Sequence, residues 1–134
     1  MTVFVVSAVV LRDDEGRIAL VRKRGTSRFM LPGGKHEQGE APAACAVREA
    51  HEELGVDLDE DRLILLGEWE APAANEPDHL VRGHIYVHPW VPGIEPRAEI
   101  EDLLWLHPDD AAHRTDLAPL FEHRVLPALS SLES

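Results

Sequence analysis

Apolar residues fall into short runs that predict strands, with a stretch of helical spacing between them. Residues 3–11 are rich in valine and nearly unbroken, which is typical of a strand buried on both faces. The polar turn at residues 13–16 then predicts a return strand at 17–23. Later apolar segments predict strands at residues 62–70, 80–90 and 103–106, with a loop containing proline and asparagine at 71–78.

Two segments have the spacing of an amphipathic helix. In residues 42–54, Pro42 stands at the first helical position, and Gly55 follows where a left-handed terminal residue is expected. A second helix is predicted near the C-terminus, with Pro127 disturbing its final turn, because apolar residues recur at Leu117, Leu120, Phe121, Val125 and Leu129. This order of elements favours an α/β fold in which a mixed sheet has helices on both faces.

The first helix carries an unusual group of acids. At 100° per residue, Glu49, Glu52 and Glu53 fall within an arc of about 100°, next to an apolar face. Like charges three and four residues apart destabilise a helix by a few tenths of a kcal/mol per pair, so the three carboxylates need a compensating cation. A hard divalent ion such as Mg²⁺ or Mn²⁺ is the natural candidate, because it prefers carboxylate, carbonyl and water oxygens. For Glu-Glu taken alone, a solvated acidic face is the alternative.

The spacing of these residues resembles the signature of the Nudix hydrolase family. That signature runs from a glycine through a glutamate, an Arg-Glu pair and a Glu-Glu pair to a second glycine and an apolar residue. Every fixed position is filled over residues 34–56, by Gly34, Glu40, Arg48, Glu49, Ala50, Glu52, Glu53, Gly55 and Val56. The flanks are also similar to the family, with the run Arg28 to Gly34 before the signature and Leu104-Trp105-Leu106 as a late strand.

The resemblance implies an enzyme with the Nudix α/β/α sandwich, formed by residues 1–134 as a single domain. It implies divalent-metal-dependent hydrolysis of a phosphoanhydride bond in a nucleoside diphosphate linked to another group, with Mg²⁺ or Mn²⁺ as cofactor. We expect a MutT-like nucleoside triphosphate pyrophosphohydrolase. The alternatives are an ADP-ribose or nucleotide-sugar pyrophosphatase, for which Pro72 is a weak indication, an isoprenoid-diphosphate hydrolase, and a Nudix domain that senses a nucleotide without turnover.

The resemblance also implies roles for individual residues. The metal ligands would be Glu49, Glu52 and Glu53 together with a backbone carbonyl, from Gly33 or, as we expect, Gly34. Glu53, with Glu52, is the first choice for assisting the attack of water. Arg48 would orient a neighbouring carboxylate, and its alternative role is a structural ion pair.

Two further sets of residues are candidates for the site. In some members of the family the catalytic base comes from a later loop, where this chain has Glu99, Glu101 and Asp102. Phosphate oxygens could meet the basic end of the second predicted strand, and we expect Arg22, Arg24 and Lys35 to bind substrate, with Lys23 as a further candidate. A strand end that extends into solvent is the alternative for these basic residues.

Composition narrows the choice of partners. The 134 residues carry 13 Lys and Arg against 25 Asp and Glu, a formal charge of −12 that would repel long nucleic acids and anionic membranes. A small phosphorylated substrate can still bind, because divalent ions reverse the local field. Residues 3–11 are too short to span a membrane, and a single cysteine is compatible with the reducing cytoplasm, where we expect the protein. The sequence does not decide whether two chains form a homodimer through an exposed edge strand.

Overall fold

The computed structural model describes residues 2–133, and the order of elements follows the predicted one closely. The strands are β1 (Thr2–Val10), β2 (Ile18–Lys23), β3 (Gly33–Lys35), β4 (Ile64–Pro72), β5 (His79–Val87) and β6 (Ile100–Leu106). The helices are α1 (Pro42–Leu54) and α2 (Leu126–Glu133), with short 3-10 turns at Glu60–Arg62 and Pro108–His113. No helix within residues 2–133 has the length and apolar character needed to cross a membrane.

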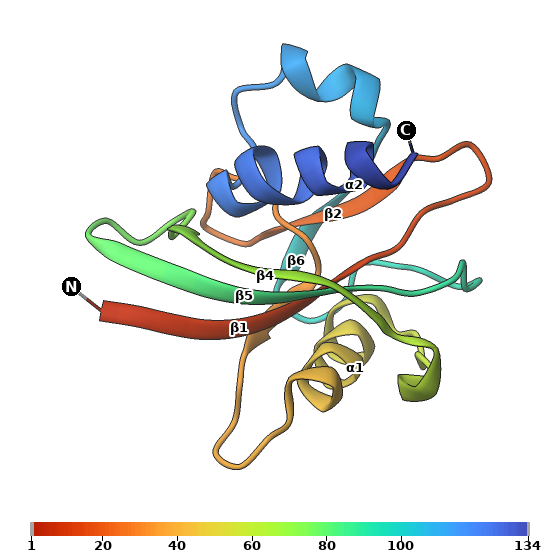
Figure 1. Ribbon diagram of the computed structural model, residues 1–134, viewed down its shortest axis with the longest axis horizontal. Helices are drawn as coiled ribbons and strands as arrows, with labels where there is room; N and C mark the ends of the chain where they lie inside the picture. Colours follow the sequence, from red (N-terminus) through yellow and green to blue (C-terminus); the bar gives the residue numbers. More distant parts are fainter. Residues whose placement is uncertain (1, 134) are drawn as a thin grey trace.

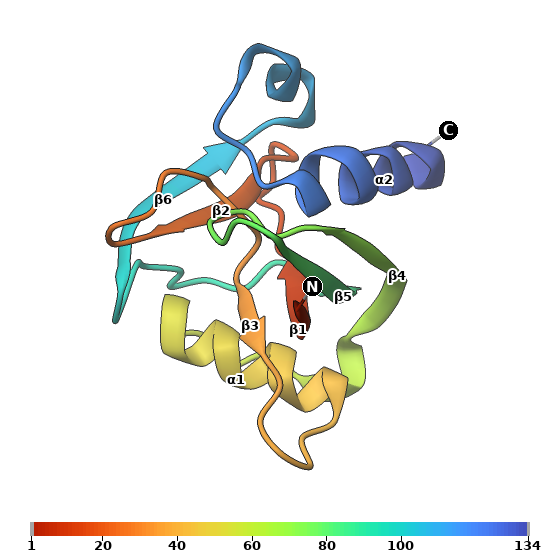
Figure 2. The ribbon, with the colours of Figure 1, turned by 90° about the vertical axis from the view of Figure 1, so that its left-hand side faces the viewer.

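The strands form two sheets rather than one. The larger sheet is mixed and has the order β3-β1-β5-β4, with β1 and β5 parallel and the outer pairs antiparallel. Strands β2 and β6 pair antiparallel as a separate ribbon. The views in Figures 1 and 2 place α1 on one side of the larger sheet and α2 on the other, which confirms the α/β class and the prediction of helices on both faces.

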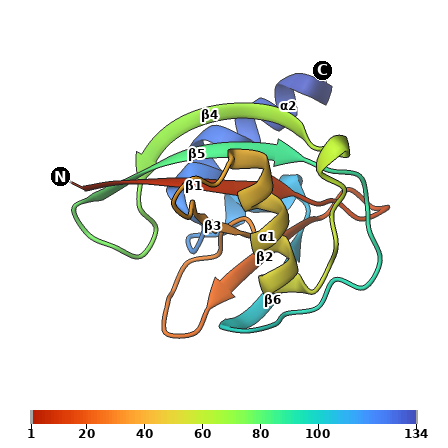
Figure 3. The ribbon, with the colours of Figure 1, turned by 90° about the horizontal axis from the view of Figure 1, so that it is seen from below.

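Alternation along β1 divides the core into two layers. Ala8 and Val10 point to the side of α2 and pack with Phe121 and Leu129, whereas Val9 points to the other side and packs with residues of α1. Helix α1 lies against β1 and β3 (Figure 3). Only the second half of β1 is buried on both faces, so the sequence-based prediction is wrong for its first half, where Val3 and Val5 are exposed.

The C-terminal helix is shifted relative to its apolar pattern, because Leu117 forms an isolated bridge with Phe29 and lies outside the helix. Helical backbone runs from residue 119 to 133, and residues Phe121–Val125 form a π-helical turn in which the Leu126 N–H donates to the Phe121 carbonyl. Proline at position 127 has no N–H to donate, yet the helix continues beyond it for six residues. The prediction that Pro127 disturbs the final turn is therefore wrong, because the irregular turn lies before the proline.

Candidate active site

The acidic helix is fixed at both ends by the residues that predicted it. Pro42 occupies the first turn, and Gly55 closes the helix in the left-handed conformation, at φ 70°, with its N–H bonded to the His51 carbonyl. The helix predicted at residues 42–54 is confirmed without a change of boundary. This placement sets the acids of α1 beside the short strand β3, which the sequence did not predict as a strand.

Two adjacent glycines allow β3 and α1 to approach closely. A side chain at Gly33 would overlap the backbone of Ser7 and Ala8 on β1, and one at Gly34 would overlap the carboxylate of Glu49. Neither glycine has a positive φ, so space rather than backbone conformation requires them. The glycine pair therefore lets the carboxylates of α1 lie directly against the backbone of β3.

Glu53 is the most deeply buried acid of the chain among residues 2–133, with 2% of its surface exposed. Its Oε1 accepts a 3.0 Å hydrogen bond from the Gly33 N–H, and its Oε2 has no hydrogen-bond partner. The Nζ of Lys23 lies 3.8 Å from that free oxygen. Burial raises the pKa of Glu53 to about 7, although the Gly33 hydrogen bond and Lys23 both act to lower it.

Arg48 donates hydrogen bonds to the other three carboxylates of the signature. Its guanidinium donates to Glu40 from Nε at 2.7 Å and from Nη2 at 2.9 Å, and its Nη1 lies 3.1 Å from Glu49 and 3.2 Å from Glu52. Hydrogen bonds from Arg48 lower the pKa of Glu40 to about 2, and the same contact raises the pKa of Arg48. Burial raises the pKa of Glu49, which the nearby Arg48 opposes. The compensating cation expected from the sequence is thus supplied in part by the chain itself.

The donor set fits a hard divalent ion in its chemistry. As the side chains stand, no three His, Cys, Asp or Glu residues between positions 2 and 133 are grouped so that they could hold a metal ion. However, Glu49 and Glu52 each accept a hydrogen bond from Arg48, and the Oε2 of Glu53 is a buried acceptor without a hydrogen-bond donor. Oxygen ligands of this kind are those that Mg²⁺ and Mn²⁺ prefer.

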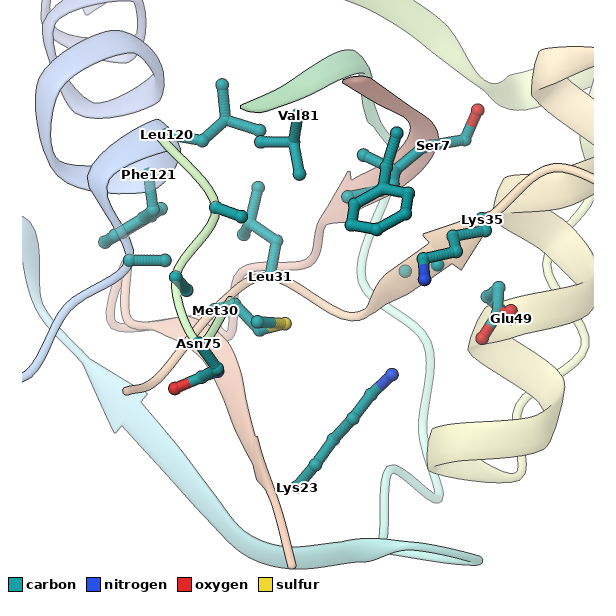
Figure 4. Close-up of a pocket in the computed structure, with 18 of the residues that line it drawn as sticks. Ser7, Lys23, Met30, Leu31, Lys35, Glu49, Asn75, Val81, Leu120 and Phe121 are labelled. Atoms are coloured by element: carbon teal, nitrogen blue, oxygen red, sulfur yellow. The ribbon is translucent and has the colours of Figure 1, made fainter. Parts of the chain in front are cut away.

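A cavity of about 570 Å³ opens beside these acids. Its acidic end is formed by Lys23, Gly33, Gly34, Lys35, Arg48, Glu49, Glu52 and Glu99. Its apolar end is formed by Met30, Leu31, Val81, Leu120 and Phe121, across the cavity from Lys35 and Glu49 in Figure 4. Glu53 lies behind this lining, next to Gly33 and Lys23.

The predicted basic residues separate into two groups. Lys23 and Lys35 line the cavity, and Lys35 also places its Nζ 3.7 Å from the centre of the Phe4 ring. Arg22 instead donates to the Thr26 carbonyl and pairs with Asp102, and Arg24 is not among the residues that line the cavity. The carboxylates of Glu53 and Glu99 raise the pKa of Lys23 against the opposing effect of burial.

The three acids predicted on the later loop, Glu99, Glu101 and Asp102, also fall into two groups. Glu99 lines the cavity and lies 3.4 Å from the Lys23 Nζ, whereas Glu101 and Asp102 pair with Arg22 on the other face of the ribbon. Sequence reasoning missed the apolar end of the cavity, because its residues come from three separate segments. The pattern gave one usable signal, which was the helical spacing of Leu120 and Phe121.

Comparison with known proteins identifies the family. A model of the NUDIX domain matches residues 1–129. A MutT-like protein of Streptomyces ambofaciens is 31% identical over 128 residues, which are 92% of this chain and 75% of that protein. A putative 8-oxo-dGTP diphosphatase of Bacillus subtilis (strain 168) is 31% identical over 77 residues, which are 58% of this chain and 50% of that protein.

A solved structure supports the same conclusion at the level of the fold. The crystal structure of a MutT protein from Methanosarcina mazei Go1 has a TM-score of 0.83 at 16% identity, over 99% of this chain and 96% of that chain. The family model covers nearly the whole sequence, and the complete Nudix signature occupies the helix and loop beside the cavity. The chain therefore belongs to the Nudix domain family, and it is a hydrolase.

Proposed function

We infer that the protein is a divalent-metal-dependent pyrophosphohydrolase that acts on nucleoside triphosphates. The observation that carries this inference is the buried carboxylate of Glu53, whose free Oε2 lies beside the acidic end of a large cavity. The Lys23 Nζ is 3.8 Å from this oxygen, beyond hydrogen-bond distance, so a cation bound closer would stabilise the charged carboxylate. The similarity to a putative 8-oxo-dGTP diphosphatase supports a nucleoside triphosphate as the substrate.

Four oxygen donors are suited to hold the metal in this proposal. They are the side chains of Glu49, Glu52 and Glu53 and the backbone carbonyl of Gly34. Bound Mg²⁺ or Mn²⁺ would neutralise phosphate oxygens and lower the pKa of water. Glu49 and Glu52 would have to leave Arg48 in part, and Arg48 would keep its two hydrogen bonds to Glu40. Arg48 is therefore a positioning residue in this scheme.

The lysines of the cavity would bind the phosphate chain. Lys23 and Lys35 lie at its acidic end, where their charges offset those of the glutamates. Water attacks a phosphorus atom, the bridging phosphorus–oxygen bond breaks, and a carboxylate takes the proton from water as pyrophosphate leaves. Glu53 is our first choice for that proton transfer, and Glu99, which lines the cavity, is the alternative. Arg22 and Arg24 would act at most from outside the cavity.

A product assay tests the proposed function. The wild-type protein is incubated with nucleoside triphosphates, oxidised nucleotides, ADP-ribose and nucleotide sugars, each with Mg²⁺ and with Mn²⁺. Pyrophosphate and a nucleoside monophosphate are the expected products from the triphosphates. Turnover of ADP-ribose alone would instead favour the pyrophosphatase alternative, for which Pro72 at the edge of the cavity is the structural indication. Binding without turnover would indicate a nucleotide sensor.

Substitutions at the acids test the assignment of roles. Glu53→Gln should lower turnover by about 10² or more while the protein stays folded. Glu99→Gln is compared with Glu101→Gln, because both acids lie on the same segment and only Glu99 lines the cavity. A larger loss in Glu99→Gln than in Glu53→Gln would move the base to Glu99. Near-normal turnover in a folded Glu53→Gln protein would refute its role.

A further inference from the structure

The apolar end of the cavity has no polar side chain of its own. Leu31, Val81, Leu120 and Phe121 come from the segment before β3, from β5 and from the C-terminal helix, and they converge across the cavity from Glu49 (Figure 4). Phe121 and Leu31 are also part of the core cluster on the side of α2, so these walls are held by packing. A group bound between these walls would meet mainly hydrocarbon.

The polar side chains near this end, Thr26, Asn75 and Glu76, belong to the loops that border the cavity. Asn75 accepts a hydrogen bond from the Ser27 N–H through Oδ1 at 3.4 Å, and Thr26 donates from Oγ1 to the Lys23 carbonyl at 2.7 Å. Both lie in loops that border the cavity rather than in the strands and helix that form its apolar walls. The walls of the apolar end itself are therefore hydrocarbon, and polar contacts with a bound group could come only from its loop rim.

Gly83 of β5 fixes how far this end extends. A methyl group at Gly83 would lie 2.7 Å from the Leu120 Cδ2, 3.2 Å from the Ile85 Cδ1 and 3.7 Å from the Val6 Cγ2, and all three neighbours line the cavity. Gly83 has no positive φ, so its backbone does not require glycine. A methyl group at this position would instead have to displace the end of the Leu120 side chain, which lies against the sheet here.

We propose that the apolar end selects the group attached to the diphosphate by its size and apolar surface, and that Gly83 sets the size limit through Leu120. The proposal rests on the proposed function, because a diphosphate held at the acidic end leaves the apolar end for the group attached to it. Apolar pockets discriminate weakly, by about 10- to 200-fold per methylene, whereas sites that hydrogen-bond their ligand reach about 10⁴ or more. The enzyme should therefore accept all four bases.

Kinetics with the four deoxynucleoside triphosphates test this proposal. For the wild-type protein we expect kcat/KM values that lie within about 10²-fold of one another. Gly83→Ala pushes Leu120 into the cavity, so kcat/KM should fall for purines by about fivefold or more relative to pyrimidines. Leu120→Ala enlarges the same space and should shift the ratio the other way. Leu132→Ala is the matched control, because Leu132 is on the same helix and is 65% exposed.

Two results would overturn the proposal. One is a preference of about 10⁴ or more for a single base, which would require hydrogen bonds that this end does not offer. The other is an equal effect of Gly83→Ala and Leu120→Ala on every substrate. If Gly83→Ala fails to fold, Leu120→Ala still tests the proposal, because it creates space instead of filling it.

A binding measurement separates this proposal from the proposed function. Methyl NMR signals of Leu120 and Val81 are followed while dTMP or dAMP is added to the wild-type protein. Both signals should shift, because both side chains line the apolar end. Shifts without turnover of any triphosphate would refute the proposed function and support the binding role. Absence of shifts, with or without turnover, would refute the placement of the base.

Discussion

The Nζ of Lys23 lies 3.8 Å from the Oε2 of Glu53 and 3.4 Å from a carboxylate oxygen of Glu99. It is the only lysine or arginine within ion-pair distance of Glu53 among residues 2–133, and it lines the cavity on the side of the acids. In the metal-free molecule, Lys23 thus holds part of the charge balance of the site. A phosphate chain that enters the cavity would meet the same ammonium group.

Removing this charge should weaken the site more than removing either neighbouring arginine. Lys23→Met keeps the length of the side chain but loses the ammonium group, and we expect kcat/KM for a nucleoside triphosphate to fall about tenfold or more. Arg22→Met and Arg24→Met should have smaller effects, because neither arginine lines the cavity. Steady-state kinetics decide the order, with the exposed Arg62→Met as control. A larger loss in either arginine variant would contradict the assignment of Lys23.

Glu53 should make the metal-free protein less stable as pH rises. Its pKa is about 7 in the folded protein against an ordinary value of 4.5, so folding favours the protonated acid. This contribution is fully present below pH 4.5 and is lost as pH rises through 7. Glu53→Gln lacks the titration, so at pH 8 it should be more stable than the wild type by about 3 kcal/mol.

Urea unfolding in the presence of EDTA measures this difference. The two proteins should have similar stabilities at pH 4.5 and should diverge towards pH 8, and taking the difference cancels the titration of other groups. Added Mg²⁺ or Mn²⁺ should stabilise the wild type at pH 8 more than the variant. Parallel stability curves across this range would mean that Glu53 does not titrate as its burial implies.

Alternation along β2 already predicted that Lys23 lies on the opposite face of the strand from Arg22 and Arg24. Arg22 has the parity of Ile18 and Leu20, which pack on the side of α2, whereas Lys23 has the parity of Val21, which packs on the side of α1. Which of the two faces meets the acidic helix cannot be read from alternation alone. That choice depends on the crossing of the ribbon over the larger sheet, which is a long-range property.

Helix α1 was predictable because the residues that define its ends and its acidic face are close together in the sequence. Pro42 and Gly55 define its ends, and a projection at 100° per residue groups its acids correctly. The helical projection at 100° per residue does not show how deeply each acid is buried. Glu53 is 2% exposed, whereas the side chain of Glu52 is 52% exposed. That difference arises from β3, which a Gly-Gly-Lys sequence does not predict, because it exists only through its pairing with β1.

The two glycines of β3 should respond differently to alanine. In Gly33→Ala the new methyl group meets the backbone of β1, which cannot move aside, so we expect a loss of about 2 kcal/mol or more in unfolding free energy. In Gly34→Ala it meets the end of the Glu49 side chain, which can rotate. Stability should then change by less than about 1 kcal/mol, while turnover falls by about tenfold or more because a proposed metal ligand is displaced.

Thermal or urea unfolding and kinetics on the same preparations separate the two glycines. Gly39→Ala is not a suitable control, because Gly39 has a positive φ that an alanine would strain. Ala44→Ser on the nearby helix adds one atom at a residue that is not among those lining the cavity, and it serves instead. Full activity in a folded Gly34→Ala protein would show that Glu49 tolerates displacement and would remove it from the proposed ligand set.

A lysine in place of Arg48 should keep the positive charge but lose the geometry of the hydrogen bonds. Its planar fork reaches Glu40, Glu49 and Glu52 at once, which the single ammonium of lysine cannot do. In Arg48→Lys the pKa of Glu40 should rise from about 2 towards 4.5. Glu40 contributes stability above pH 4.5 that is lost as pH falls towards 2, and a pKa closer to 4.5 makes this contribution smaller in the variant.

The same substitution should weaken metal binding by about 10- to 100-fold, because the carboxylates would lose the group that orients them. NMR titration of the Glu40 side chain and Mn²⁺ binding followed by electron paramagnetic resonance give two independent readings, with Arg62→Lys as the exposed control. A purely structural ion pair would alter the Glu40 titration and leave Mn²⁺ affinity unchanged. A positioning role requires both to change, because Arg48 holds Glu40 and two proposed ligands through one guanidinium.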